Sequence, residues 1–435
     1  MISEKDRLYM RELAKQVKEI ADNDIWKEKI YLWQKFNKLE SVRPMVMNII
    51  TDECWPELIG GKDLKMEDPF LKSWEYYLKK KIYRWENVRD DIVTTDKIYV
   101  PIDYAFTEWA ENRIRPFAAN NRPYESDGKT AAAFHPCILE YDDWDKLVKK
   151  PELKYIDWKK SEQDMNILVD LFGDILDVRQ GEPFYSSIDT SAKGWGLSGI
   201  DILCELRGLE NIMYDLYDEP DFVHMAMKFL CDGLNDYLDT LEKENLLRLN
   251  NNEFLKNANT PLGSNGLSIS DELPGNSCDV NHVRTQDLWG YCQAQEFAPV
   301  SAEMLNEFVL PYQKPLADRF GMIAYGCCEP NDFKYDCLMN TFSNLRQISV
   351  CHVADIRLAA EKIKDKYTIS WKPHCTLIDN FNEQKVRSFM EEGFEVFKDC
   401  HVVCSLRDNL TLHGANDSFT RWTNIAMEIA ERYHK

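Results

Sequence analysis

Residues 322–329, Met322-Ile323-Ala324-Tyr325-Gly326-Cys327-Cys328-Glu329, join a short apolar run to a polar ending, and this pattern decides the fold. Similar apolar runs recur along the chain, and most are followed by an amphipathic helical stretch. These runs lie at 45–50, 98–100, 184–189, 246–249, 288–292, 347–350, 367–370 and 401–406. Strands that alternate with helices form parallel sheets. The number of such units predicts an α/β fold, a closed (β/α)8 TIM-type barrel.

The first 43 residues differ from this pattern, because their apolar side chains recur at helical spacing, as in Leu13, Val17 and Ile20. We therefore expect an N-terminal helical extension over 1–43 and the barrel over 44–435. Within the barrel, helices are expected at 299–320, 354–364, 383–392 and 419–433. No glycine-rich phosphate-binding loop and no internal repeat stands out in the sequence.

Composition excludes several classes of function. The chain has 435 residues, 53 Lys and Arg against 74 Asp and Glu, and a net charge of −21, which disfavours binding to nucleic acid. No apolar stretch approaches the roughly 18 residues of a membrane span, and residues 1–7 lack a secretory signal. We therefore expect a cytoplasmic protein with no membrane partner, and a homodimer is among the assemblies we consider. An odd count of 13 Cys without an export signal argues against a disulfide framework.

Several predicted strands end in side chains that can carry chemistry. In a barrel of this type the active site lies at the carboxyl ends of the strands. There the sequence places Cys327-Cys328-Glu329, then Cys351-His352, then Trp371 to Cys375, and finally Cys404 with Arg407-Asp408. Thiols and carboxylates suit zinc, which takes about four ligands. The alternatives are a reactive thiol at Cys327-Cys328-Glu329, a Cys328 nucleophile paired with His352 or His374, and buried packing of single Cys residues.

Carboxylates and aromatic side chains near other strand ends complete the candidate site. Glu296 and Asp408 are candidates for proton transfer, and Asp189, Glu272 and His374 are candidates for contacting a substrate. Helix capping is the competing interpretation for Asp189 and for Asp271. Tyr185 and Trp371 could line an apolar substrate pocket, although isolated aromatic residues are more often part of a core.

The segment Gly208–His224 (GLENIMYDLYDEPDFVH) resembles the helix-turn-helix of the uroporphyrinogen decarboxylase-like superfamily. The order of the later strand endings, Tyr325-Gly326-Cys327 and then Trp371-Lys372-Pro373, is similar as well. The resemblance runs from about residue 184 to the C-terminus and implies a (β/α)8 barrel. The decarboxylases of that superfamily hold substrate carboxylates with an Arg-rich stretch near the N-terminus. Residues 45–53 contain no Arg, so the methyltransferase branch is favoured.

The resemblance to the methyltransferase branch implies a zinc ion that is bound by a His-x-Cys pair and by a distant Cys. Cys327 matches the Cys of that pair, while Tyr325 stands at the position of the His, and Cys404 lies near the expected distant Cys. The resemblance thus implies Cys327 as a metal ligand, with Cys404 or Asp408 as the distant one, while relatives that use carboxylates and His would give a place to Glu329, Glu296 or His374. With Cys328, the neighbouring thiol, the expected ligand set is Cys327, Cys328, Glu329 and Cys404. The resemblance further implies a corrinoid carried by a partner protein.

The function expected from this resemblance is O-demethylation. A methyl group would pass from a small methylated donor, with an aryl methyl ether favoured, to the cobalt of the corrinoid protein. Zinc would act as a Lewis acid on the leaving oxygen. Two alternatives stay open at this point: a decarboxylase or lyase acting on a small carboxylated substrate, and a non-catalytic protein that binds a small molecule.

Overall fold

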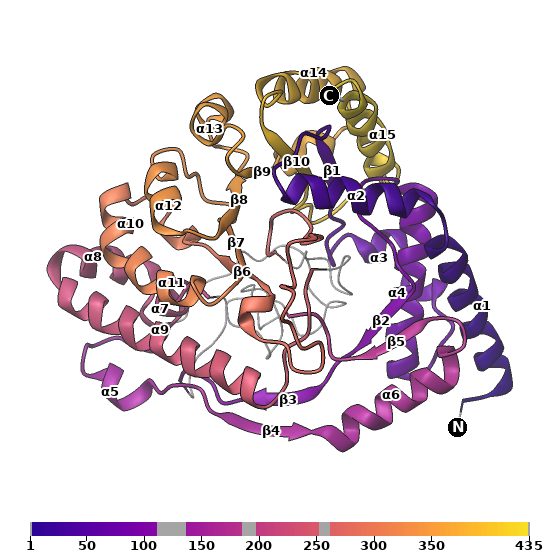
Figure 1. The fold of residues 1–435 in the computed structure, drawn as a ribbon, viewed down its shortest axis with the longest axis horizontal. Coiled ribbons are helices and arrows are strands. Elements are labelled where there is room, and N and C mark those ends of the chain that lie inside the picture. The colour runs from indigo at the N-terminus through magenta and orange to yellow at the C-terminus, as the bar shows by residue number, and fades with distance from the viewer. Residues whose placement is uncertain (1, 111–135, 185–196, 252–261, 434–435) are drawn as a thin grey trace.

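The largest sheet of the protein has six parallel strands in the order β1-β10-β9-β8-β7-β6, which follow one another along an arc in Figure 1. The computed structural model describes residues 2–110, 136–184, 197–251 and 262–433. The strands of this sheet are β1 (Met45–Asn48), β6 (Trp289–Cys292), β7 (Met322–Tyr325), β8 (Leu345–Val350), β9 (Thr368–Trp371) and β10 (His401–Leu406). Within the described ranges β1 and β6 are its edges. The parallel α/β architecture is confirmed, and closure into a barrel stays a prediction.

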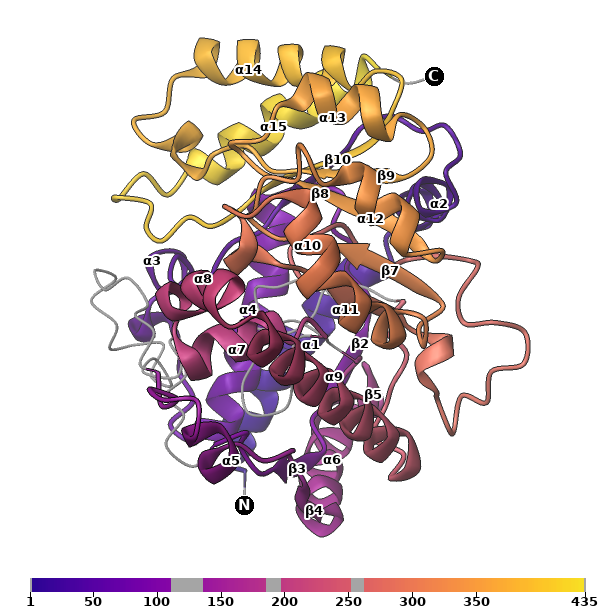
Figure 2. The same ribbon diagram turned by 90° about the vertical axis from the view of Figure 1, so that its left-hand side faces the viewer.

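Helices cover the outer side of this arc (Figure 1). The view turned by 90° in Figure 2 shows three of them, α13, α14 and α15, together at one end of the molecule, with β3 and β4 near the other. The helices after the first four are α5 (Asp143–Leu147), α6 (Trp158–Phe172), α7 (Ile200–Arg207), α8 (Leu209–Asp218), α9 (Pro220–Lys243), α10 (Ala302–Phe308), α11 (Leu310–Ala317), α12 (Tyr335–Thr341), α13 (Ile356–Ile363), α14 (Glu383–Val396) and α15 (Ser418–Glu431).

Successive side chains of each strand point to opposite faces of the sheet, because the side-chain period of a strand is two. On β10, Val402, Cys404 and Leu406 pack into the large apolar cluster that contains the residues of α14 and α15. Val403 belongs to a second cluster together with Met45 and residues of the N-terminal helix α2. The sheet therefore has an outer face against the helices and an inner face against other segments of the chain.

The N-terminal section is helical, as expected. It comprises α1 (Glu4–Ala21) and α2 (Ile25–Asn37), and it is followed by α3 (Trp55–Leu58) and α4 (Pro69–Asn87). The side chain of Ser3 caps α1 by accepting the amide of Asp6 at 3.1 Å. The indole Nε1 of Trp33 on α2 donates to the carbonyl oxygen of Asp91 at 2.8 Å. The division of the chain at residue 43 stays a prediction.

The structure corrects two details of the predicted elements. The expected helix over 299–320 is broken into α10 and α11 at Val309, and Pro311 and Pro315 lie in the second piece. The apolar run 246–249 is not a strand, although the amide of Phe184 donates to the carbonyl oxygen of Arg248 at 3.0 Å.

The four remaining strands form two small sheets apart from the large one: β2 (Lys97–Val100) with β5 (Asp177–Gln180), and β3 (Asp103–Phe106) with β4 (Leu153–Asp157).

An irregular segment, residues 264–272, runs along the inner face of the sheet from its carboxyl end to its amino end. Near its start, Asn265 Nδ2 donates to the carbonyl oxygen of Gly326, just beyond the carboxyl end of β7, at 3.1 Å. At its end, Glu272 pairs with Arg346 near the amino end of β8 at 2.6 Å. The segment is therefore antiparallel to the strands that it crosses.

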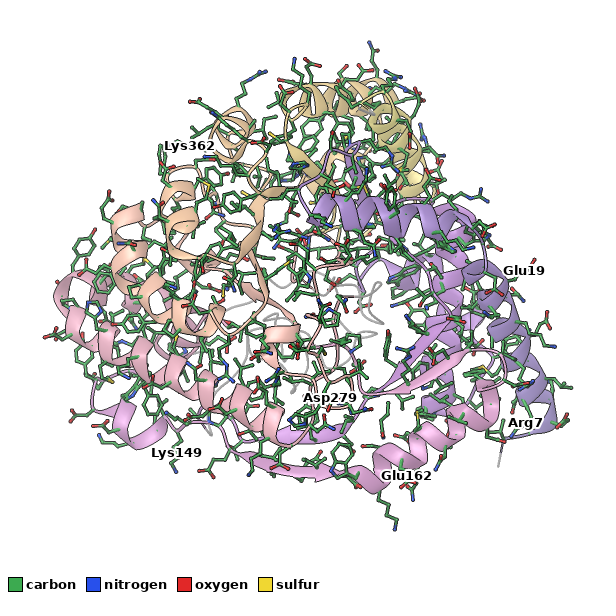
Figure 3. The ribbon with its side chains drawn as sticks, viewed as in Figure 1. Arg7, Glu19, Lys149, Glu162, Asp279 and Lys362 are labelled. Carbon is green, nitrogen blue, oxygen red and sulfur yellow. The ribbon has the colours of Figure 1, made fainter. Side chains whose placement is uncertain are left out.

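Charged side chains project outward around the molecule, as Glu19, Lys149, Glu162 and Lys362 show in Figure 3. No helix in the described part of the chain combines the length and the apolar character required to cross a membrane.

Candidate functional site

Polar side chains from neighbouring strands meet at the carboxyl end of the large sheet. Lys372, directly after β9, places its Nζ atom 2.6 Å from the carbonyl oxygen of Cys327, which follows β7. The sulfur of Cys328 lies 3.8 Å from Asp408 Oδ2, just after β10. We call these residues, together with Arg407, the thiol cluster. The predicted convergence of these strand endings is therefore present in the structure.

The backbone around Cys327 is fixed on both sides. Its amide donates to Glu329 Oε2 at 2.7 Å, and its carbonyl oxygen accepts from Ser349 Oγ and Lys372 Nζ, each at 2.6 Å. Gly326, just before it, has a φ of 95°, and a Cβ atom there would lie 2.8 Å from Cβ of Ser349. This left-handed turn requires glycine, and it sets the course of the backbone into Cys327.

The two neighbouring thiols differ in acidity. Their sulfur atoms lie 3.7 Å apart. The hydrogen bond from Cys328 lowers the pKa of the Cys327 thiol well below its usual value, and although burial opposes this, the positive charges of Lys372 and Arg407 add to it. The pKa of Cys328 is raised, because its proton is held against the Cys327 sulfur and because the site is buried. The two shifts therefore make Cys327 the more acidic thiol of the pair and Cys328 the less acidic one.

Lys372 is buried, with only 2% of its surface exposed. Burial lowers the pKa of Lys372, while the charge of Cys327 acts in the opposite direction. The ammonium group also donates to Ser264 Oγ at 2.7 Å and contacts Ser349 Oγ. This set of acceptors holds a cation inside the sheet, next to Cys327.

Arg407 is the second cation of the thiol cluster, and 10% of its side chain is exposed. Its Nε donates to Asp408 Oδ1 at 3.0 Å. Burial opposes ionisation of Asp408, but the guanidinium outweighs it and holds the pKa of Asp408 below its usual range. Within the described part of the chain, the buried Nη1 atom of Arg407 has no hydrogen-bond partner.

Glu296 lies in the short 3-10 helix η4 (Gln295–Phe297), just beyond β6. Burial, reinforced by the negative charge of Asp201, raises its pKa to about 8. One carboxylate oxygen, Oε2, accepts from Gln293 Nε2 at 3.4 Å. Glu296 therefore keeps its proton at neutral pH, as a general acid requires.

Glu329 has a positioning role in the structure. Only 1% of its surface is exposed, and its two oxygen atoms accept the amides of Ala294, at 3.2 Å, and Cys327, at 2.7 Å. Its carboxylate thus ties the end of β6 to the end of β7. The predicted role of Glu329 as a metal ligand is not supported, because both oxygens already bind backbone.

Cys404 is a correction to the predicted ligand set. Its side chain belongs to the outer apolar cluster between β10 and the helices, and it is fully buried there. Ser405 and Val403 occupy the other face of the strand, since side chains alternate. Cys404 therefore packs in the outer core. Cys327, in contrast, packs against a separate apolar cluster of the inner face that contains Tyr291 and Ala324.

Trp371 is a second correction. It was expected to line a substrate pocket, but it is 1% exposed and its ring stacks on Phe389 of α14 with the centroids 5.4 Å apart. A Cβ atom on Gly393 of the same helix would lie 2.0 Å from the Trp371 ring. Trp371 thus fills the outer core, and its neighbour Lys372 points to the inner face instead.

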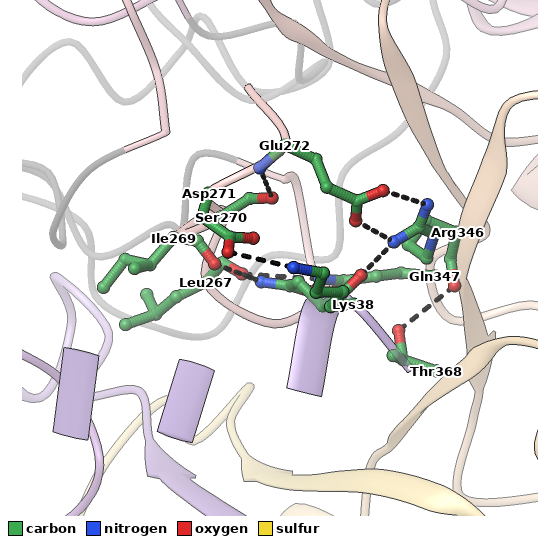
Figure 4. Close-up of polar contacts among 10 residues, drawn as sticks. Lys38, Leu267, Ile269, Ser270, Asp271, Glu272, Arg346, Gln347 and Thr368 are labelled. Carbon is green, nitrogen blue, oxygen red and sulfur yellow. Dashed lines mark hydrogen bonds and ion pairs between the residues drawn. The ribbon is translucent and has the colours of Figure 1, made fainter. Parts of the chain in front are cut away.

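Glu272 is a third correction, and its surroundings are drawn in Figure 4. Its Oε2 lies 2.6 Å from Nη1 of Arg346, which also contacts the carbonyl oxygen of Asn37. The adjacent Asp271 pairs with Lys38 at 3.2 Å. Glu272 therefore lies at the amino end of the sheet, opposite the thiol cluster, and does not contact a substrate there.

The remaining predicted residues lie at the rim or outside the described residues. His374 follows β9, is exposed, and binds Thr376 Oγ1 through Nδ1 at 2.7 Å. Its ring packs edge-on against His352, with the centroids 4.5 Å apart. Tyr185 and Asp189 fall outside the described residues.

The described side chains show whether a zinc ion could bind where the sequence predicts one. Among residues 2–110, 136–184, 197–251 and 262–433, no three His, Cys, Asp or Glu side chains are grouped so as to hold a metal ion. The two thiols and Asp408 approach one another only in pairs. The described residues do not fit the predicted zinc site.

Sequence reasoning gave no role to the two cations of the thiol cluster, Lys372 and Arg407. Both stand directly after a buried strand, and that position is the signal that could have identified them. Ser264, which holds Lys372, carries no comparable signal, because its contact depends on the path of segment 264–272. Ser349 lies within the buried strand β8 and carries no such signal either.

Comparisons with known proteins were made against family models, curated sequences and solved structures. No family model matches the chain, and no curated protein matches it. Among solved structures, a methyltransferase from Methanosarcina mazei matches at a TM-score of 0.43 and 10% sequence identity, over 92% of this chain and 98% of that chain. The function proposed below rests on the geometry of the site.

Proposed function

We propose that the protein is a methyltransferase that takes a methyl group from a small methylated donor, with an aryl methyl ether preferred. One observation carries the proposal: Cys327, whose thiol pKa is lowered by its neighbours, lies just after β7, while Glu296, beyond the adjacent strand β6, has its pKa raised to about 8. An ether carbon resists attack because its oxygen is a poor leaving group. A nucleophile at the carbon and an acid at the oxygen together overcome that resistance.

The final acceptor that we propose is the cobalt of a corrinoid held by a partner protein. The support is the sequence resemblance, together with the position of the thiol cluster at the carboxyl edge, where Cys327 and Cys328 are only half-buried. Carboxyl edges of parallel strands are the usual place for active sites in (β/α)8 barrels. We include barrel closure and rim contacts of His374 with the donor in this proposal.

A second candidate function is favoured by the cations. Arg407 Nη1 is a buried donor with no partner in the described residues, and Lys372 lies in the same cluster. Guanidinium and ammonium groups are the usual partners of carboxylates. This pair supports a decarboxylase or lyase acting on a small carboxylated substrate.

The experiment that tests the proposal uses the full chain with free cob(I)alamin as the acceptor. Aryl methyl ethers with and without a ring carboxylate, and glycine betaine, are offered as donors. Formation of methylcobalamin is followed by its absorption spectrum, and the demethylated product by chromatography. We expect a phenol and methylcobalamin in equal amounts, and we expect Glu296→Gln to slow the reaction by about 10² to 10⁴.

The control is Cys400→Ser, at the turn before β10 and at the opposite end of that strand from the thiol cluster. It should leave the rate unchanged. Release of carbon dioxide from carboxylated donors without methyl transfer would favour the second candidate. Binding of donors without any turnover would overturn both enzymatic functions and leave a protein that only binds small molecules.

A further inference from the structure

The sulfur atoms of Cys327 and Cys328 are in contact, 3.7 Å apart, at the carboxyl end of β7. A disulfide bond is about 2.05 Å long, so the sulfurs would have to approach by about 1.6 Å for the bond to form. Rotation about the Cα–Cβ bond of one cysteine covers such a distance. The two thiols can therefore meet without any movement of the sheet.

Both thiols can be reached from solvent. Each belongs to a half-buried residue, and Asp408, whose Oδ2 lies 3.8 Å from the sulfur of Cys328, has 49% of its side chain exposed. Cysteines of the outer core differ, because Cys204 and Cys404 are fully buried. A small oxidant therefore has access to the first pair and not to these core thiols.

The two cysteines lie in a turn outside any helix or strand. The turn is anchored at Cys327, whose amide donates to Glu329 Oε2 at 2.7 Å and whose carbonyl oxygen accepts from Ser349 Oγ and Lys372 Nζ, each at 2.6 Å. The contact of Cys328 with a neighbouring carboxylate is longer, at 3.8 Å. The movement that brings the sulfurs together should therefore fall mainly on Cys328.

A disulfide between neighbouring cysteines is strained. The peptide bond between Cys327 and Cys328 is trans, which holds their Cα atoms about 3.8 Å apart. Ordinary disulfides have Cα separations of about 4.4–6.8 Å. Strained or exposed disulfides are more easily reduced than structural ones, and they are the labile or regulatory class. A bond at this position should therefore open again in the presence of small thiols.

On this basis we propose that Cys327 and Cys328 form a redox switch, in which a small-molecule disulfide such as oxidised glutathione closes the bond and small thiols reopen it. The inference goes beyond the proposed methyltransferase and does not depend on it. In the closed form neither sulfur carries a proton or a negative charge, so neither can act as a nucleophile. Closure thus stops thiol chemistry at the carboxyl edge of the sheet.

The exchange takes place in two steps. In the first, one cysteine, as its thiolate, attacks a sulfur of oxidised glutathione; the sulfur–sulfur bond of the oxidant breaks, and one glutathione leaves and takes up a proton. In the second, the other cysteine attacks the protein-bound sulfur and releases the second glutathione in the same way. The two cysteines together lose two electrons and two protons, and the two glutathione molecules gain them.

The test incubates the full chain with oxidised glutathione, blocks the remaining thiols with N-ethylmaleimide, and maps the peptides by mass spectrometry. We expect the peptide that contains Cys327 and Cys328 to lose two hydrogen atoms and to carry neither glutathione nor the blocking group. Dithiothreitol should restore both thiols. In Cys328→Ser, glutathione bound to Cys327 should accumulate at least about tenfold more than in the unaltered protein, because the intramolecular second step is lost.

Cys278, which precedes β6, provides the matched control, since it is also half-buried. Cys278→Ser should leave closure of the bond between Cys327 and Cys328 unchanged.

Three results would overturn the inference. One is glutathione that stays bound to Cys327 or Cys328 in the unaltered protein at the level seen in Cys328→Ser, since the second thiol then fails to reach the first. Another is modification of Cys278 while both thiols of the pair stay free. The third is a closed bond that dithiothreitol does not reopen. No ether enters this experiment, so its outcome and that of the methyl-transfer assay are separate.

Discussion

Replacing Glu296 by Gln should stabilise the protein at alkaline pH. Burial and the charge of Asp201 raise the pKa of Glu296 from its ordinary 4.5 to about 8. Between these two pH values the unfolded chain has lost this proton and the folded chain still holds it. The folded state then binds more protons, so stability falls as pH rises through this window. At ~1.4 kcal/mol for each pH unit, the loss above pH 8 reaches about 5 kcal/mol.

The amide of Glu296→Gln cannot ionise, so the variant escapes this loss. The free energy of unfolding should be measured in urea for both proteins at about pH 5 and about pH 9. We expect similar values at the lower pH, and at the higher pH an advantage of up to about 5 kcal/mol for the variant. Glu361→Gln, at an exposed position on α13, should show no such dependence. A difference between unaltered protein and variant that stays the same at both pH values would refute the reasoning.

Three further predictions concern the corrected residues and a buried ion pair. Trp371→Ala should lower the free energy of unfolding by about 3–5 kcal/mol, because it empties a fully buried site against α14; an altered KM with unchanged stability would contradict this. Glu272→Gln should change the free energy of unfolding by less than about 1 kcal/mol and leave methyl transfer intact, since its pair with Arg346 is partly exposed and remote from the thiol cluster. Asp91→Asn should cost about 3–5 kcal/mol in the same assay, because it removes the buried carboxylate of Arg43 and leaves only the exposed carboxylate of Glu431; a loss under about 1 kcal/mol would count against this.

The strands of the large sheet could be predicted closely from the sequence. β7 and β10 have the bounds expected for them, Met322–Tyr325 and His401–Leu406. Both strands are buried on both faces, so each appears as an unbroken apolar run that ends where a polar residue begins. The predicted helix over 299–320 is instead two helices, because a proline inside a helical pattern removes a backbone hydrogen bond and breaks the helix.

The face to which a side chain points could not be predicted from such runs. When every residue of a strand is buried, the hydrophobic pattern does not distinguish the outer face from the inner one. For this reason Trp371 and Cys404 were expected in the site, although both pack against the helices. One known inward residue fixes the others by alternation, so that Lys372 could have excluded its neighbour Trp371.

The misplacement of Glu272 has a different cause. It follows an apolar segment, 267–269, which has the appearance of a strand, and such endings were expected at the carboxyl edge of the sheet. That segment runs antiparallel to the large sheet, with Gly266 bound to the side chain of Gln347 at 2.9 Å. Chain direction relative to a sheet is a tertiary property, and it is absent from local periodicity.

The proposed chemistry requires a nucleophile, Cys327, and an acid, Glu296. The distribution of charge at the carboxyl edge of the sheet shifts the pKa values of these two groups in opposite directions. Lys372 and Arg407 lie on the side of β9 and β10, where they favour the negative form of Cys327. Glu296 lies beyond β6, where burial and Asp201 favour its neutral form. Opposite environments push the two pKa values apart, so that a nucleophile and an acid coexist at neutral pH. If a cation stood beside Glu296 instead, the acid would lose its proton, and the leaving oxygen would have no donor.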